Sequence, residues 1–171
     1  MKLSKLMTAI VCGILFTTAC KKAATNDQEN INDVTINIGA SNFRWVDADG
    51  TGGAAPKIDT IKLLPGFNST FTVNLSDASQ TPSKSFNGEV DAEKDVHLFV
   101  FKTTGGNLTI TDLSKDNNLK DFGRTAKLTT TTAGAGTLQI ILKHMPDKQA
   151  ANPSTTGETD VDVTFPVVIK N

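Results

Sequence analysis

Residues 160–169 read DVDVTFPVVI and carry the pattern that decides the fold of this chain. Apolar side chains at Val161, Val163 and Phe165 alternate with polar ones, which is the period of a β-strand that turns one face toward a core. Pro166 follows, and because proline has no N–H to donate to a neighbouring strand, we expect an edge position or a β-bulge there. The stretch therefore predicts a half-buried strand at the end of a β-domain.

The same alternation recurs along the chain from residue 34 onward. The expected strands cover residues 34–38, 42–46, 58–63, 69–75, 96–102, 107–111, 126–132, 136–143 and 160–169. Glycine-containing turns separate most of them, and helix is expected only over 91–96, DAEKDV, whose acidic start suits a helix N-terminus. About eight or nine Thr-rich strands in one domain, residues 34–171, predict the all-β class and a two-sheet Greek-key β-sandwich of immunoglobulin-like type.

Two further features of the strand pattern give more specific expectations. The segment 96–102, VHLFVFK, is bulky on both faces, which is typical of a central strand. The segments 126–132 and 136–143 are separated by a short stretch that contains Gly134 and Ala135, and this spacing predicts a hairpin with a loose turn.

Residues 1–19 have the organisation of a secretory signal peptide. A basic start is followed by an apolar run over 6–16 and by small residues that end at Ala19. The run is shorter than the roughly 20 residues of a bilayer-spanning helix. Cys20 comes next, an order that resembles the lipobox of bacterial lipoproteins, although Thr17 stands where Leu, Val or Ile is usual. We expect cleavage after Ala19 and lipidation of Cys20; the alternative is ordinary cleavage that leaves a free thiol.

Residues 20–33 are polar and lack hydrophobic periodicity, so we expect the lipidated Cys20 to be followed by a flexible tether. Acyl chains on Cys20 would anchor the protein to a membrane through lipid burial. No cysteine follows Cys20, which excludes a disulfide framework and a thiolate metal site in the domain. The 17 basic and 18 acidic residues nearly balance, so no nucleic-acid partner is expected.

The densest polar motif is DADGTGG at 47–53. Asp47 and Asp49, followed by glycines, offer carboxylate and backbone oxygens of the kind that calcium binds. The alternative is a tight turn, for which Asp-Gly is a favoured pair and in which Asp side chains bond to their own backbone.

The two histidines are the candidate ligands for a softer metal. His97 and His144 each continue the apolar face of an expected strand. Together with a carboxylate such as Asp95, Glu158 or Asp160, they would suit zinc or copper. The alternative is a purely structural role, because each histidine stands alone in the sequence, without a partner at helical or strand spacing.

Catalysis has little support in the sequence. Tyrosine is absent, and no serine stands in a nucleophile elbow. We expect Glu158 and Asp160 to be solvated charges on one exposed face of the last strand, so a hydrolase is the less favoured alternative to a non-enzymatic protein. Thr60, between an aspartate and an isoleucine, fits a short O-glycan acceptor pattern that also occurs by chance.

Several segments together resemble a group of small bacterial cell-envelope lipoproteins that carry the label "type 1 periplasmic binding fold superfamily". These segments are DADGTGG (47–53), IDTIKLLPG (58–66), STFTVNL (69–75), DAEKDVHLFVF (91–101), LKHMPDK (142–148) and GETDVDVTFPVVI (157–169). The resemblance spans about 34–170 and implies a place beside TonB-dependent outer-membrane receptors. We therefore expect a lipid-anchored binding or accessory protein of the outer membrane, linked to nutrient or metal uptake, with binding of zinc, copper or calcium as the alternative function.

Overall fold

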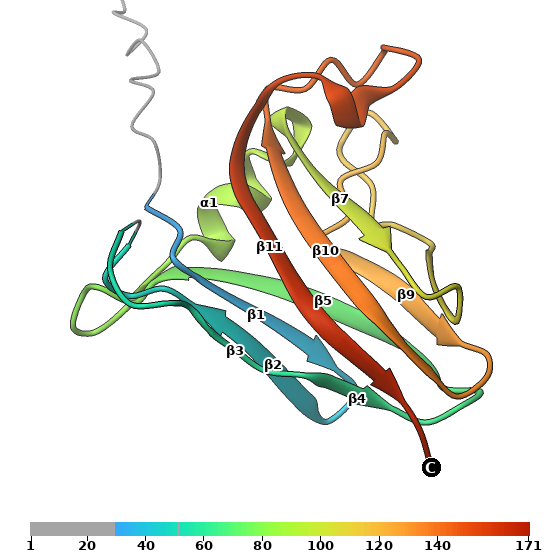
Figure 1. Cartoon of the computed structure of the whole chain (residues 1–171). Helices are drawn as coiled ribbons and strands as arrows, with labels where there is room; N and C mark the ends of the chain where they lie inside the picture. Colours follow the sequence, from blue (N-terminus) through green and yellow to red (C-terminus); the bar gives the residue numbers. More distant parts are fainter. Residues whose placement is uncertain (1–29, 51) are drawn as a thin grey trace, which may run out of the picture.

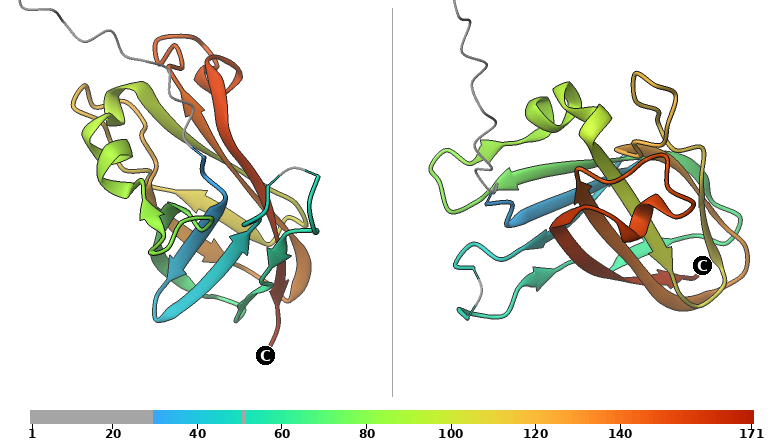
Figure 2. Two further views of the ribbon diagram at one scale, coloured as in Figure 1. Left: turned by 90° about the vertical axis from the view of Figure 1, so that its left-hand side faces the viewer. Right: turned by 90° about the horizontal axis from the view of Figure 1, so that it is seen from above.

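Residues 30–50 and 52–171 are described by the computed structural model, and their strands form two layers (Figures 1 and 2). The strands are β1 (Asp33–Ile38), β2 (Ser41–Val46), β3 (Lys57–Ile58), β4 (Ile61–Leu63), β5 (Asn68–Asp77), β6 (Lys84–Ser85), β7 (His97–Thr103), β8 (Leu108–Thr111), β9 (Thr125–Thr130), β10 (Gly134–His144) and β11 (Glu158–Ile169). The helical segments are α1 (Asn87–Ala92) and two 3₁₀ turns, η1 (Lys94–Val96) and η2 (Pro153–Thr155).

The two sheets confirm the expected all-β sandwich. The larger sheet has seven strands in the order β3-β2-β1-β5-β9-β8, with β6 paired to β5. Strand β5 lies beside β1, the first of three strands that pair in succession, which is the Greek-key arrangement. The smaller sheet has four strands in the order β4-β11-β10-β7, and only β4 runs parallel to its neighbour.

The core forms where the inner faces of the two sheets meet. From Val34 in β1, Phe71 in β5 and Val161 in β11 onward, every second residue is buried, as the alternation of the sequence predicts. The largest fully buried side chains include Phe71, Phe99 and Phe165. Phe71 of the larger sheet meets Phe101 of the smaller one edge to face, with the ring centroids 5.2 Å apart. Such aromatic pairs add to the hydrophobic contribution of their burial.

The described part of the chain has eleven strands, rather than the expected eight or nine. In addition, one expected strand and one expected hairpin are each divided between the two sheets. The segment 58–63 was expected to be one strand, but β3 pairs with β2 while β4 pairs with β11. The half-buried Thr60 lies between them. Likewise β9 and β10 do not form the expected hairpin, because they belong to different sheets. A period of two is the same in either sheet, so the sequence pattern does not reveal a change of sheet.

Strand β7 is an edge strand, and the expectation of a central position was wrong. It pairs only with β10. Its outward side chains Leu98 and Val100 are apolar because the loops after β8 and β10 lie against that face, where they line a cavity with both residues. The Phe99 N–H also bonds to the Phe122 carbonyl, at 2.7 Å, which covers part of the open edge.

Pro166 lies where β11 has no ladder partner on one side. Its neighbour β4 pairs only with residues 167–169, so the proline comes just before this pairing begins. The single irregularity in the β10–β11 ladder lies elsewhere, between Leu142 and Lys143. There Leu142 pairs with Val161 and Lys143 with Thr159, which leaves Asp160 as an extra residue.

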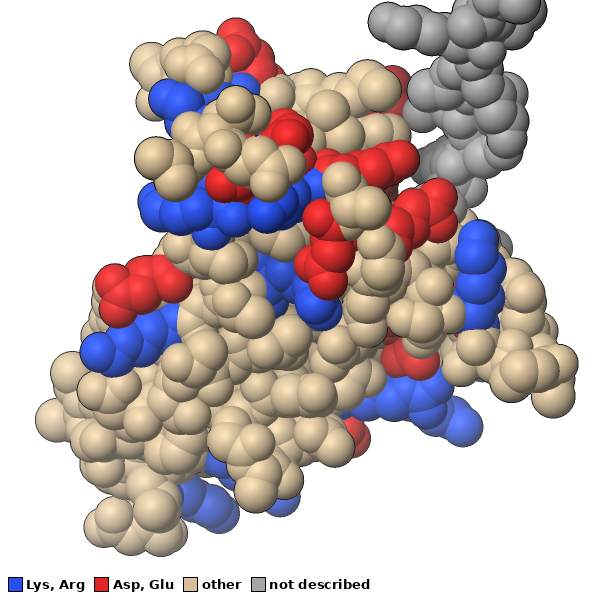
Figure 3. Space-filling model, turned by 180° about the vertical axis from the view of Figure 1, so that it is seen from behind, with Lys and Arg blue, Asp and Glu red and all other residues tan. Residues whose placement is uncertain are grey.

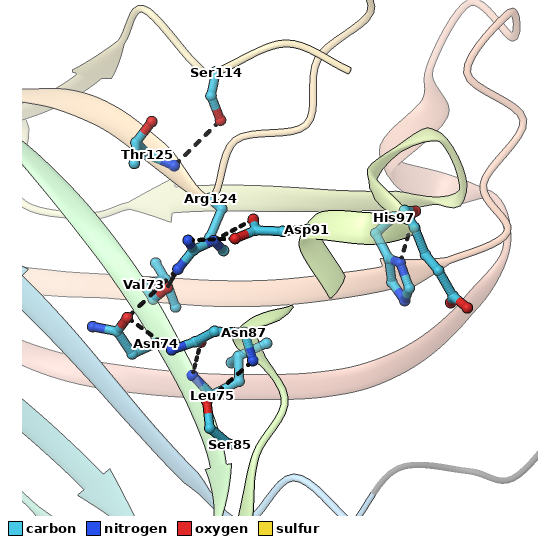
Figure 4. Close-up of polar contacts among 11 residues, drawn as sticks. Val73, Asn74, Leu75, Ser85, Asn87, Asp91, His97, Ser114, Arg124 and Thr125 are labelled. Carbon is cyan, nitrogen blue, oxygen red and sulfur yellow. Dashed lines mark hydrogen bonds and ion pairs between the residues drawn. The ribbon is translucent and has the colours of Figure 1, made fainter. Parts of the chain in front are cut away.

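The helix begins earlier than expected, at Asn87 rather than Asp91. Polar contacts hold it against the larger sheet (Figure 4). Arg124 of the segment before β9 donates two hydrogen bonds of 2.6 Å to the Asp91 carboxylate, and the Asn87 amide oxygen accepts the Leu75 N–H at 2.8 Å. Val90 of α1 is fully buried. These contacts fix α1 and the η1 turn that leads into β7.

The expected signal peptide (1–19), the cleavage site after Ala19 and the lipidated Cys20 lie outside the described residues. At the other end of the expected tether, Asp33 already belongs to β1. The Asn32 amide donates to the Asp77 carboxylate at 3.0 Å and accepts the Ala78 N–H at 2.7 Å. The last tether residues therefore bond to the sandwich. No helix within the described part of the chain is long and apolar enough to cross a membrane.

Gly157 ends the loop after β10 and lies next to the residues that begin this loop. This residue has a φ of 72°, and a Cβ atom there would come closer than 3.0 Å to backbone atoms of His144 and Pro146. We expect Gly157→Ala to lower the free energy of unfolding by about 1–3 kcal/mol, because alanine must adopt a left-handed backbone in a crowded place. Urea unfolding measures the difference. The control is Gly88→Ala, which meets nothing within 4 Å; an equal loss in both variants would contradict the explanation.

Candidate functional site

The two histidines form a cross-strand pair. His97 begins β7 and His144 ends β10, and the antiparallel register places them directly opposite each other. Their imidazole rings stack, with centroids 4.8 Å apart and planes inclined by 10°. His97 is almost fully buried, whereas the His144 side chain is 21% exposed. Residues that stand alone in the sequence thus become neighbours through sheet pairing.

The η1 turn sets the orientation of the His97 ring. The His97 Nδ1 atom lies 3.0 Å from the Glu93 carbonyl oxygen (Figure 4). A carbonyl oxygen can only accept, so Nδ1 carries the proton in this hydrogen bond. The lone pair of the neutral ring is then on Nε2, which is the atom left free to bind another group.

Asp160 provides a carboxylate next to both rings. Its Oδ2 atom lies 3.9 Å from Nε2 of His97 and 4.0 Å from Nδ1 of His144. The Asp160 side chain is only 9% exposed, so the expectation of a solvated charge was wrong. Strict alternation from the inward Val161 would point Asp160 outward, but the extra residue in the ladder redirects it toward the histidines.

Glu93, at the end of α1, provides a second carboxylate near the two histidines. One oxygen of Glu93 and one ring nitrogen each of His97 and His144 lie within 4.8 Å of one another. Glu93 itself is exposed, at the C-terminal end of α1. The sequence reasoning missed Glu93, although its position four residues before His97 in a helical segment was a usable signal.

Burial has the largest effect on the pKa values of His97 and Asp160. Desolvation lowers the pKa of His97, and the hydrogen bond from its ring to the Glu93 backbone offsets only part of that effect. Desolvation also raises the pKa of Asp160, while the nearby rings of His144 and His97 act in the opposite direction. Burial therefore favours the neutral form of the His97 ring, which is the form that binds metal ions.

These distances are close to those of a metal site. A zinc ion with bonds of about 2.0–2.2 Å in a tetrahedral arrangement holds two ligand atoms about 3.3–3.5 Å apart. The two nitrogen–oxygen separations around Asp160 are 3.9 and 4.0 Å. Movements of about half an ångström per contact, within the range of small side-chain rotations, would bring Asp160 to ligand spacing from one nitrogen of each ring.

The other carboxylates suggested by the sequence have different surroundings. Asp95 accepts hydrogen bonds from the backbone and side-chain N–H groups of Asn117, at 2.9 and 2.8 Å, and these bonds engage both of its carboxylate oxygens. Glu158 lies opposite His144 in the ladder, is exposed, and its charge contributes to raising the pKa of Asp160. Of the three candidates, Asp160 has the position a shared ligand needs.

Asp47 and Asp49 lie far along the chain from the histidines, in the loop between β2 and β3. The Asp49 carboxylate accepts the Ala54 N–H at 2.8 Å, and this bond holds the pKa of Asp49 below its usual value. The Gly50 N–H bonds to the Asp47 carbonyl at 3.3 Å, as in a turn. Asp47 Oδ1 is buried and has no hydrogen-bond partner among the described residues. The turn is confirmed, and a calcium ion stays a prediction.

The lowered pKa of His97 predicts a pH dependence of stability. The unfolded chain binds a proton at this ring near pH 6.5, whereas the folded chain does so only at lower pH, so stability falls as the pH drops below about 6.5. In the presence of chelator we expect His97→Asn, which retains an amide donor near Nδ1, to lose part of this dependence. One group contributes at most about 1.4 kcal/mol per pH unit. Urea unfolding between about pH 7.5 and 5.5 measures it, and equal slopes in both proteins would contradict the assignment.

Known proteins add no further constraint on this site. No protein-family model matches the chain, and no curated protein or solved structure matches it either. Its interpretation rests on the geometry of the four side chains Glu93, His97, His144 and Asp160, called the histidine site from here on.

Proposed function

We propose that this chain is a non-enzymatic, lipid-anchored binding protein of the cell envelope whose histidine site holds a divalent transition-metal ion. The observation that carries the proposal is the stacked pair of His97 and His144, with the Asp160 carboxylate about equally far from a nitrogen of each. Imidazole and carboxylate ligands together suit zinc and copper better than calcium, which prefers oxygen alone.

The donor set favours retention of an ion over catalysis. The two histidines have a carboxylate on either side, Asp160 and Glu93, and a site that used all four side chains would fill the tetrahedral coordination of zinc. A catalytic zinc site keeps one position for water or substrate. The buried side of the site, formed by His97 and Asp160, also limits access of water. These features support binding or structural stabilisation rather than hydrolysis.

The position of the protein in the cell is proposed from its N-terminal sequence. Lipid on Cys20 would hold it at the outer membrane, and the polar residues that follow would let the sandwich move relative to the anchor. An outer-membrane uptake receptor is the proposed partner, on the basis of the resemblance described above. Crosslinking in intact envelopes, followed by purification through this chain, tests the association; recovery without any receptor would contradict it.

Native mass spectrometry tests the metal directly. The sample is the chain from Lys21 to Asn171, which contains both sheets complete, purified without chelator and titrated with zinc, copper(II) and calcium. We expect one zinc or copper ion per chain, lost in His97→Asn and weakened in Asp160→Asn. The matched control is Asp95→Asn, which removes a carboxylate two residues from His97 that bonds to Asn117 instead.

Each outcome of this experiment discriminates between the alternatives. An unchanged mass at all metal concentrations would overturn the proposal. A calcium ion that is lost in Asp47→Asn and unaffected by His97→Asn would move the metal to the 47–53 loop, where Asp47 Oδ1 has no partner among the described residues. Retention of zinc in both His97→Asn and Asp160→Asn would place the ion elsewhere.

A further inference from the structure

A cavity of about 320 Å³ lies beside β7, and none of the four side chains of the histidine site lines it. Its apolar lining includes the outward side chains Leu98 and Val100 together with Ile110 of β8 and Leu113 of the following loop. Pro153 of η2 also lines the cavity. The cavity therefore lies between β7 and two loops that pack over this edge strand, and its lining also includes Phe99 and Phe101 of β7.

The position of the cavity explains the amino-acid pattern of β7. An edge strand with no sheet against its outer face normally carries polar residues there. Leu98 and Val100 are apolar instead, and Leu98 is only 6% exposed. A lining that combines apolar side chains with polar ones, at a volume in the lower range of small-molecule pockets, is compatible with a ligand site.

All but one of the charged side chains that line this cavity have a partner of opposite charge. The Lys148 ammonium bonds to the Asp116 carboxylate at 2.9 Å and to the Lys94 carbonyl at 2.7 Å. The Asp121 carboxylate accepts from Lys115 at 2.6 Å. Lys120 is half-buried, and its ammonium group has no hydrogen-bond or ion-pair partner among the residues that the structure describes.

Lys120 belongs to a chain segment that also contains Lys115, Asp116 and Asp121. Charged side chains of both signs gather on the upper part of the face in Figure 3, and the lower part of that face is largely uncharged. An anion bound in the cavity would gain an ion pair only at a cation that has no partner of its own. Of the lysines that line the cavity, Lys148 is paired and Lys120 is available.

We propose that this cavity binds a small organic anion, with an unbranched apolar chain against Leu98, Val100 and Leu113 and a carboxylate at the Lys120 ammonium. The apolar chain gains from the removal of its surface from water. The carboxylate gains a charge-assisted hydrogen bond at the only unpaired cation of the lining, counted over the described residues. This binding does not require a metal ion in the histidine site.

Isothermal titration with matched probes tests the inference. Octanoate and octylammonium share one apolar chain and differ in the sign of their charge, and the protein is the chain from Lys21 onward. We expect saturable binding of octanoate, and binding of octylammonium at least about fivefold weaker. Lys120→Gln should weaken octanoate about fivefold and leave octylammonium unchanged or slightly tighter.

Two variants locate the site and control for charge. Val100→Glu places a carboxylate in the apolar lining and should abolish octanoate binding, while thermal unfolding checks that the variant is folded. Lys57→Gln removes an exposed lysine of β3 in the other sheet and should bind as the wild type does. No saturable heat with octanoate, equal affinity for both probes, or an unchanged affinity in both Lys120→Gln and Val100→Glu would each overturn the proposal.

Discussion

Replacing Lys148 with methionine is expected to lower the free energy of unfolding by about 3 kcal/mol or more. The Lys148 and Asp116 side chains are only 8% and 1% exposed, and their charged atoms are 2.9 Å apart. Methionine keeps the apolar stem but leaves the Asp116 carboxylate buried without its cation. Removal of one partner of a buried ion pair is costly for this reason.

The pair links two loops that border the cavity. Lys148 belongs to the loop after β10 and Asp116 to the loop between β8 and β9. The Asp116 carboxylate also accepts the N–H groups of Asn118 and Lys120, at 2.9 and 2.8 Å. Burial alone would raise the pKa of Asp116, but the hydrogen bonds from Lys148 and from these N–H groups outweigh it, so the pKa lies below its usual value.

Two controls separate burial from charge. Lys115→Met breaks the pair with Asp121, whose side chains are 52% and 54% exposed, and should cost less than about 1 kcal/mol. The double variant Lys148→Met, Asp116→Asn removes both charges and should recover much of the loss. Urea unfolding at pH 7 measures all three. Equal losses for Lys148→Met and Lys115→Met would show that burial does not govern the pair.

Zinc is expected to stabilise the wild-type protein strongly. An ion that binds only the folded state raises the free energy of unfolding by about 2.7 kcal/mol when its free concentration is 100 times Kd. Because the histidine site joins α1, β7, β10 and β11, its ion would crosslink segments from distant parts of the sequence. Thermal unfolding with buffered free zinc measures the effect.

The same measurement identifies the ligands. His97→Asn and His144→Asn should lose the stabilisation by zinc, whereas Asp95→Asn should retain it. Unfolded chains also bind zinc through histidine, which reduces the effect, so the comparison between variants is more informative than the absolute shift. Stabilisation of equal size in the wild type and His97→Asn would contradict the histidine site without affecting the cavity proposal.

Local patterning was sufficient for the class of the fold and for most of its strands. The alternation at Val34, Ile36 and Ile38 and at Val161, Val163 and Phe165 identified inward faces that are buried in the structure. This succeeds because a strand has a period of two, whatever its partner. The same reasoning failed for β7, since apolar residues on both faces indicate cover on both sides but not whether a sheet or loops provide it.

The sequence by itself determined a β-sandwich with alternating core residues, the turn at Asp47 and Asp49, and the types of side chain available for chemistry. Only the tertiary structure decided which of them meet. Strand register placed His97 opposite His144, and one extra residue in the β10–β11 ladder redirected Asp160 toward both. The pairing of His97 with His144 joins residues 47 positions apart, and a local period contains no information about the partner of a strand.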